Sequence, residues 1–174
     1  MFVLTESAFS HETILDDLSY LGQPLKKIDS DTLDGYDFSG ELLHTAIFEG
    51  LSLQHASFEQ ANLRSANFAY CILNNTNFTS SLLMNTNFLG ASLINCKLVN
   101  SKLSGAFFQD ANLEGANLKN ADLFAVNMNN ANLKGANMNA SRIMDATFTN
   151  AIFDKNTIWP EGFSPLKAGA KYVD

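Results

Sequence analysis

Few side chains in this 174-residue sequence are of types that could perform chemistry, and their spacing does not suit it. Three histidines, His11, His44 and His55, have no partners at the spacing of a metal site or a nucleophile–base pair. Residues 164–167 read Ser-Pro-Leu-Lys and match S-x-x-K, but no other element of such an active site accompanies them. We therefore expect no enzyme activity, no catalytic residue, no cofactor and no metal.

The element that must position every other residue is a repeating unit of five residues. Each fifth residue from Leu33 to Ile158 is large and apolar, which gives 26 consecutive units. On a helix this stripe would wind around the axis, and on a flat strand it would alternate between the two faces. All the large residues can point inward only if the chain turns a corner in every unit. The period therefore predicts a solenoid.

Two further positions of each unit support a narrow solenoid. The residue two before each large one is small at nearly every unit, Leu51 being the exception between residues 46 and 151. Cys71 and Cys96 fall at this position, so we interpret them as buried small residues and not as a redox pair. Two residues after the large one, Gly and Asn recur, and both tolerate the positive φ of a tight corner.

The alternation of Leu and Phe at the large positions favours four sides per coil. With three units per coil, Leu would stack on Phe; with four, Leu stacks on Leu and Phe on Phe, as in the column Phe48, Phe68, Phe88 and Phe108. Two units per coil would also stack like on like, but would leave no interior.

Units such as Ala61-Asn62-Leu63-Arg64-Ser65 and Ala131-Asn132-Leu133-Lys134-Gly135 resemble the A(D/N)LXX repeat of the pentapeptide-repeat family. The resemblance covers about three-quarters of the chain. It implies an all-β fold, a right-handed quadrilateral β-helix. We expect this β-helix over residues 33–158, with 26 repeats in about 6.5 coils.

Both ends of the solenoid need caps, because an open coil exposes unpaired backbone. Residues 1–32 are predicted to form the N-terminal cap, with an amphipathic α-helix at about 10–21 lying over the first coil. Residues 159–174 are predicted to form a short C-terminal cap. Its start, Trp159-Pro160-Glu161-Gly162-Phe163, resembles the closing segment of many cyanobacterial members of the family, and we expect Trp159 and Phe163 to cover the last coil.

Charge restricts the kinds of partner. The formal net charge of −7 disfavours nucleic-acid binding. Residues 1–59 carry eleven acids and two bases, whereas residues 60–109 carry three bases and no acid. No stretch is apolar enough to span a membrane, and the first residues lack the pattern of a signal peptide. We therefore expect a cytoplasmic protein that binds neither nucleic acid nor membrane.

One side of the predicted coil carries an unusual set of outward residues. It is the side built on Leu43, Leu63, Leu83, Leu103, Leu123 and Ile143. Its candidate interaction residues are Leu42, Arg64, Leu82, Met84, Lys102, Phe124, Arg142 and Met144. An apolar band with basic residues and no acids is typical of a protein-interaction surface. Scattered surface hydrophobes are the alternative interpretation.

The function that this pattern favours is a non-catalytic scaffold, with a regulatory role left open, that presents a flat face to another protein. That partner would be partly apolar and acidic. The sequence leaves homodimerisation open. The alternative comes from the resemblance, since some pentapeptide-repeat proteins bind DNA gyrase, a topoisomerase, by imitating DNA. Such mimicry needs acids along the outside of the rod, which residues 60–109 do not supply.

Overall fold

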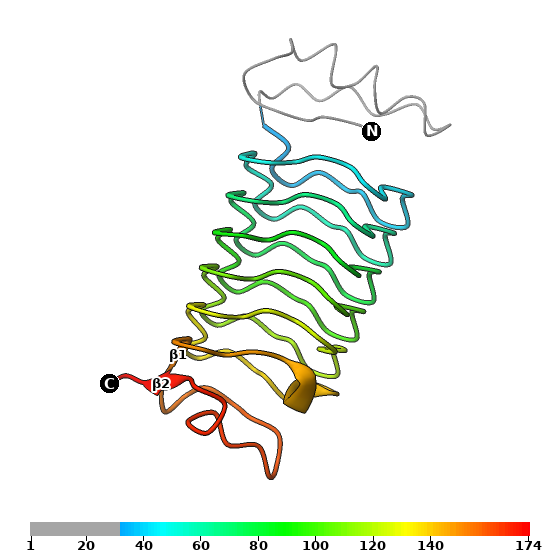
Figure 1. Cartoon of the computed structure of the whole chain (residues 1–174). Helices are drawn as coiled ribbons and strands as arrows, with labels where there is room; N and C mark the ends of the chain where they lie inside the picture. The colour runs from blue at the N-terminus through cyan, green and yellow to red at the C-terminus, as the bar shows by residue number, and fades with distance from the viewer. Residues whose placement is uncertain (1–31) are drawn as a thin grey trace.

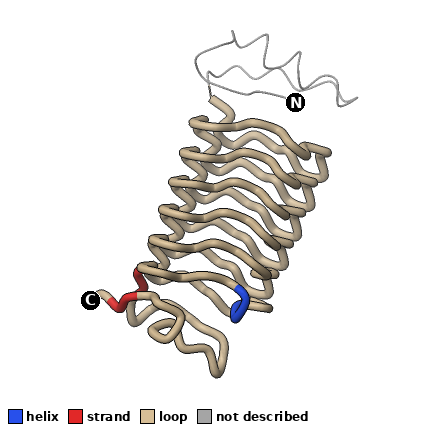
Figure 2. The backbone as a smooth tube through the Cα atoms, in the orientation of Figure 1, coloured by secondary structure: helices blue, strands red, loops and turns tan. Residues whose placement is uncertain are grey.

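The computed structural model describes residues 32–174, which form a rod of stacked four-sided coils (Figure 1). The predicted helix at residues 10–21 lies outside the described residues. Almost the whole rod is loop and turn (Figure 2). The regular elements are the 3-10 helix η1 (Ile143–Asp145) and the short strands β1 (Ile152–Phe153) and β2 (Lys171–Tyr172).

Successive coils are joined by single parallel bridges between residues twenty positions apart, such as Ser52 with Ile72 and Ile72 with Ser92. Twenty residues are four units of five, so the predicted four-sided coil is confirmed. Each inward residue from Phe38 to Leu118 donates its N–H to the carbonyl nineteen positions on, as Phe68 does to Asn87 (2.7 Å). The coils are therefore bonded to one another along the length of the rod.

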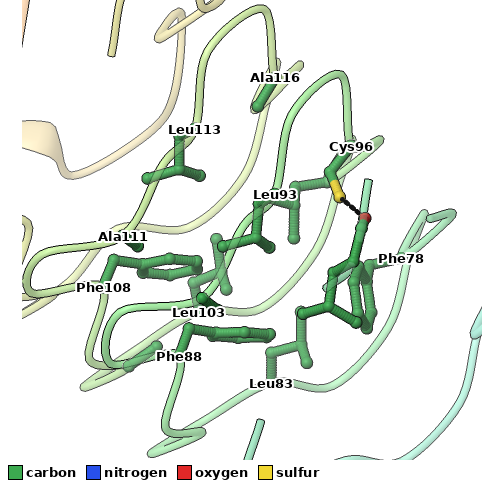
Figure 3. Close-up of a cluster of buried hydrophobic side chains, with 14 of the residues drawn as sticks. Phe78, Leu83, Phe88, Leu93, Cys96, Leu103, Phe108, Ala111, Leu113 and Ala116 are labelled. Carbon is green, nitrogen blue, oxygen red and sulfur yellow. Dashed lines mark hydrogen bonds between the residues drawn. The ribbon is translucent and has the colours of Figure 1, made fainter. Parts of the chain in front are cut away.

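The predicted inward positions from Leu33 to Phe153 are all buried. Like residues stack on like: Phe48, Phe68, Phe88 and Phe108 form one column, with ring centroids 4.6, 5.3 and 4.6 Å apart. Figure 3 shows Phe88 and Phe108 within this core, among leucines and small residues of neighbouring sides. Phe58 and Phe78 belong to a second column. Their rings meet that of Phe68 edge to face, a geometry that aromatic pairs prefer.

The corners also follow the sequence. The second residue after each inward one has a positive φ at every unit from Gly35 to Gly135. Glycine and asparagine occupy many of these corners because they adopt this conformation at low cost.

The unbroken register is the first prediction that the structure corrects. Ala140 does not adopt the left-handed corner conformation; its N–H donates to the Met138 carbonyl (2.7 Å) in a tight three-residue turn. Ser141, not Arg142, then bridges to Asp122, so this coil is one residue short at that point. The turn that contains η1 is one residue longer, and the twenty-residue spacing is restored at Thr147. The left-handed conformation is unfavourable for alanine. Arg142 adopts it instead (φ 53°), so the shift moves the left-handed conformation from alanine to arginine, whose contacts described below stabilise the new arrangement.

The second correction concerns the last predicted inward residue. Ile158 is 54% exposed and bridges to Asn137, because the unit after Phe153 contains six residues. Trp159 turns toward the core instead. It meets Phe148 and Phe153 edge to face, with centroids 5.6 Å away in both cases, and it stacks on Phe163 at 5.2 Å. The larger apolar area of the indole explains why it displaces isoleucine.

Residues 159–174 close this end of the rod. Strand β2 pairs in parallel with β1. The last hydrogen bonds of this side run from the Lys171 N–H to the Ala151 carbonyl and, just after β2, from the Val173 N–H to the Phe153 carbonyl. The backbone edge of the final coil is thereby partly covered, as a solenoid end requires.

The core predicts a large contrast between two phenylalanines. Phe68→Ala should lower the free energy of unfolding by about 3–5 kcal/mol, because it leaves a cavity in the column of rings. Phe107 lies outward and is 50% exposed, so Phe107→Ala should cost less than about 1 kcal/mol. Urea denaturation of both variants measures the difference. Similar losses would contradict this assignment of inside and outside.

Candidate protein-interaction surface

We call the side built on Leu43, Leu63, Leu83, Leu103, Leu123 and Ile143 the front face. Its ladder of bridges runs from Leu42 through Asn62, Leu82 and Lys102 to Asp122. The ladder places Leu42, Leu82 and Lys102 in one row. A second row holds Arg64, Met84 and Phe124, each of which directly follows the inward leucine of its unit. Arg142 and Met144 lie at η1, where Arg142 contacts Phe124. The structure therefore brings the predicted residues onto one side.

The apolar residues of the front face differ in exposure. Met144, Leu42 and Phe124 are 72%, 62% and 45% exposed, whereas Leu82 and Met84 are half-buried. The most exposed apolar groups therefore lie toward the two ends of the face.

The sequence prediction missed acids on this face, namely Asp122 in the ladder and Asp145 in η1. Asp122 forms an ion pair with Arg142, whose Nε donates to the carboxylate at 2.7 Å and whose Nη2 also donates to the Ser104 hydroxyl at 3.2 Å. The guanidinium lies over the Phe124 ring, 4.7 Å from its centroid. The expectation of a face without acids was therefore wrong. Since the two residues stand twenty positions apart, one coil, the four-sided register could have revealed the pair.

Two opposing effects act on the Asp122 carboxyl. Its partial burial raises the pKa, but hydrogen bonds from the Arg142 side chain and from the Phe124 N–H lower it by more. The pKa therefore lies below its usual value. The ion pair holds the Arg142 side chain in place and leaves one side of its guanidinium open to solvent, since the side chain is 48% exposed.

The other two cations of the front face have no such partner. Within residues 32–174, Arg64 and Lys102 form no salt bridge, and both are exposed. Leu82 and Met84 lie in the coil between them. The middle of the front face is therefore apolar with a positive charge on either side.

The cysteines and histidines do not assemble a second site. Burial raises the pKa of Cys71 to about 12 and raises that of Cys96 further, and each thiol donates to a backbone carbonyl in the interior. His44 and His55 are exposed. Among the described residues, no cluster of His, Cys, Asp or Glu could hold a metal ion. In the same range, no helix is long and apolar enough to cross a membrane.

A four-sided β-helix with a five-residue period defines the class of protein. The family model described as "Pentapeptide repeats" matches this chain in 8 copies, in overlapping segments from residue 44 to residue 139, which is more than half of the chain. The chain belongs to the pentapeptide repeat family, and its fold is the right-handed quadrilateral β-helix.

Several solved structures are similar. A pentapeptide repeat protein (Rfr23) from the cyanobacterium Cyanothece 51142 is 32% identical, over 63% of this chain and 64% of that one, with a TM-score of 0.49. One from the Arabidopsis thaliana thylakoid lumen is 29% identical, over 71% and 66%, with a TM-score of 0.42. This chain thus spans about two thirds of the length of each protein.

A third similar structure is a trypsin-treated variant of QnrB1, a plasmid-mediated fluoroquinolone resistance protein. It is 18% identical, over 79% of this chain and 78% of that chain, with a TM-score of 0.48. A search of curated proteins found no match. The assignment to the family rests on the sequence match, and none of these structures identifies a partner for the front face.

The Asp122–Arg142 pair can be tested by titration. In Arg142→Gln, the pKa of Asp122 should rise toward its usual value, because the largest stabilising hydrogen bond to the carboxylate is lost. Carboxyl carbon NMR signals followed against pH measure it. Asp154 is the internal control: its pKa is lowered mainly by the Gly135 N–H and should not change. An unchanged Asp122 pKa would contradict the pairing.

The same pair links stability to pH. Because the folded pKa of Asp122 is depressed, its contribution is present above the unfolded pKa and is lost as pH falls through the folded value. As pH falls through the folded pKa of Asp122, the wild type should therefore lose unfolding free energy. Arg142→Gln should lose less over the same pH range.

Proposed function

We propose that this protein is a non-catalytic cytoplasmic scaffold that binds another protein through its front face. One observation carries the proposal. The front face combines exposed apolar side chains with two cations, Arg64 and Lys102, that have no acidic partner within residues 32–174. Such a combination is typical of surfaces that bind a complementary protein.

The rigidity of the face favours binding. The backbone is hydrogen-bonded to the coil above and below, so its residues lose little conformational freedom when a partner docks. Arg142 is held by Asp122 and Phe124 before any partner arrives. Arginine and aromatic residues fixed in this way often dominate the energy of an interface. Leu82, Met84 and Phe124 would meet apolar groups of the partner.

Charge complementarity defines the chemistry of the partner. Arg64 and Lys102 would pair with carboxylates, so the partner should present acids beside apolar residues. Because these cations are exposed, their main effect should be on association rate and on choice of partner.

Mimicry of DNA is the competing function, and the distribution of acids does not favour it. The coils formed by residues 60–109 carry no acid, whereas a DNA mimic needs acids along the rod. The similarity to QnrB1 is at 18% identity and supports only the fold.

The proposal predicts that two substitutions on the front face prevent partner capture. Tagged wild-type protein and Met84→Glu/Phe124→Glu should be compared in pull-downs from the native host. The variant should lose any partner that the wild type recovers, because two carboxylates replace apolar contacts and repel an acidic surface. Val99→Glu/Lys119→Gln makes the same change of charge on a different side and should retain the partner. Equal recovery by wild type and front-face variant would refute the proposal.

An enzymatic assay separates the two functions. Purified protein at micromolar concentration should leave DNA supercoiling by gyrase unchanged. Inhibition at that concentration would favour the DNA mimic instead.

A further inference from the structure

A second apolar surface spans the side of the Phe48 column, the corner that follows it, and the side of the Leu33 column (Leu33, Leu53, Leu73, Leu93 and Leu113). We call it the aromatic edge; its residues are Glu49, Tyr70, Ile72, Leu89, Phe107 and Asp110. Tyr70, Phe107 and Ile72 are 60%, 50% and 43% exposed. These residues come from successive coils and from two neighbouring sides of the rod.

The ring of Tyr70 packs on its own rod. A Cβ atom added to Gly90, at the same corner of the next coil, would lie 2.8 Å from two carbons of the tyrosine ring. The ring therefore lies against the glycine, and it still remains more than half exposed. An aromatic group that already packs on its own rod needs less ordering to form an interface.

The charges of the aromatic edge are opposite to those of the front face. Glu49 accepts a hydrogen bond from the Asn67 amide, and Asp110 accepts from the Asn130 and Gln109 amides. Neither carboxylate forms a salt bridge within the described part of the chain. The aromatic edge is therefore apolar and acidic, which is the chemistry expected of a partner for the front face.

The separation of charge extends around the middle of the rod. Between residues 60 and 120, the two acids, Asp110 and Glu114, belong to the sides of the Phe48 and Leu33 columns. The bases of the same segment belong to the other two sides; they are Arg64, Lys97, Lys102 and Lys119. The rod thus has an acidic half and a basic half across its width.

From these observations we infer that the aromatic edge of one copy of this protein docks on the front face of a second copy. On the front face, Leu82 and Met84 lie between Arg64 and Lys102 along the rod. At the aromatic edge, Tyr70, Ile72 and Leu89 lie between the coils of Glu49 and Asp110. The apolar centres can therefore meet with charges of opposite sign beyond them at either end, the acids standing three coils apart and the bases two.

The contact is between different surfaces, so it does not close on itself. Each copy keeps a free front face and a free aromatic edge, and association continues into side-by-side chains of rods. One side of a narrow rod offers a small area, at the lower end of the range for specific interfaces. We therefore expect weak, concentration-dependent association.

This inference rests on the proposed function, because it names one occupant of the front face. Sedimentation equilibrium of the full chain tests it, from about 10 µM to about 1 mM, where a small interface should begin to populate. The average mass of the wild type should rise above the 19.1 kDa of one chain as concentration rises. A wild type that stays monomeric over the whole range would overturn the inference, while partner capture in a pull-down could still succeed.

Two variants show which surfaces meet. Met84→Glu/Lys102→Glu disables the front face, and Tyr70→Ser/Phe107→Ser disables the aromatic edge; each variant alone should remain monomeric. Serine already occupies equivalent corner and ladder positions, at Ser65 and Ser57, so the second variant should fold. Lys97→Glu/Val99→Glu makes the same charge change as the first variant on another side, and it should associate like the wild type.

A mixture of the two monomeric variants gives the sharpest result. Each retains the surface that the other lacks, so a 1:1 mixture should reach the mass of a heterodimer and none larger. A mixture that stays monomeric, or an aromatic-edge variant that associates like the wild type, would show that these two surfaces do not meet.

Discussion

The hydrogen bond between successive coils is the interaction on which this structure depends. From Phe38 to Leu118 each inward residue donates its N–H to the carbonyl nineteen positions on. Ladder residues such as Asn67 donate theirs to a carbonyl of the preceding coil, that of Ala46. This spacing puts residues twenty apart into columns, so that phenylalanine meets phenylalanine and leucine meets leucine. The narrow interior, the left-handed corners and the flat outer sides all follow from it. The outer surface is free to vary because none of this bonding uses its side chains.

That freedom explains how a uniform rod can carry specific surfaces. Backbone and core specify where each outward residue stands, and substitutions there change charge and apolar area without altering the fold. In this chain the middle coils carry bases on two sides and acids on the other two, with apolar groups between them. The proposed binding face and its proposed occupant both use this separation across the rod. Neither requires a cavity, a metal or a moving segment.

The sequence predicted the parts of the structure that repeat. One period was enough to assign the inward residues from Leu33 to Phe153, and the alternation of Leu and Phe indicated four sides. The departures depend on contacts between coils, which a period cannot contain. Ser141 takes the bridge to Asp122 that the period assigns to Arg142, and Trp159 replaces Ile158 because it can pack on two phenylalanines. The aromatic edge also depends on the stacking of coils, since its residues come from successive coils and from two neighbouring sides.

The twenty-residue coil is the central claim, and NMR couplings across hydrogen bonds test it most directly. In protein labelled with nitrogen-15 and carbon-13, the Phe68 amide nitrogen should couple to the carbonyl carbon of Asn87, whose oxygen lies 2.7 Å from that nitrogen. Equivalent couplings should join Leu83 to Lys102 and Phe88 to Phe107. A three-sided coil would instead couple Phe68 to Leu82, fourteen positions on, and that result would contradict the account.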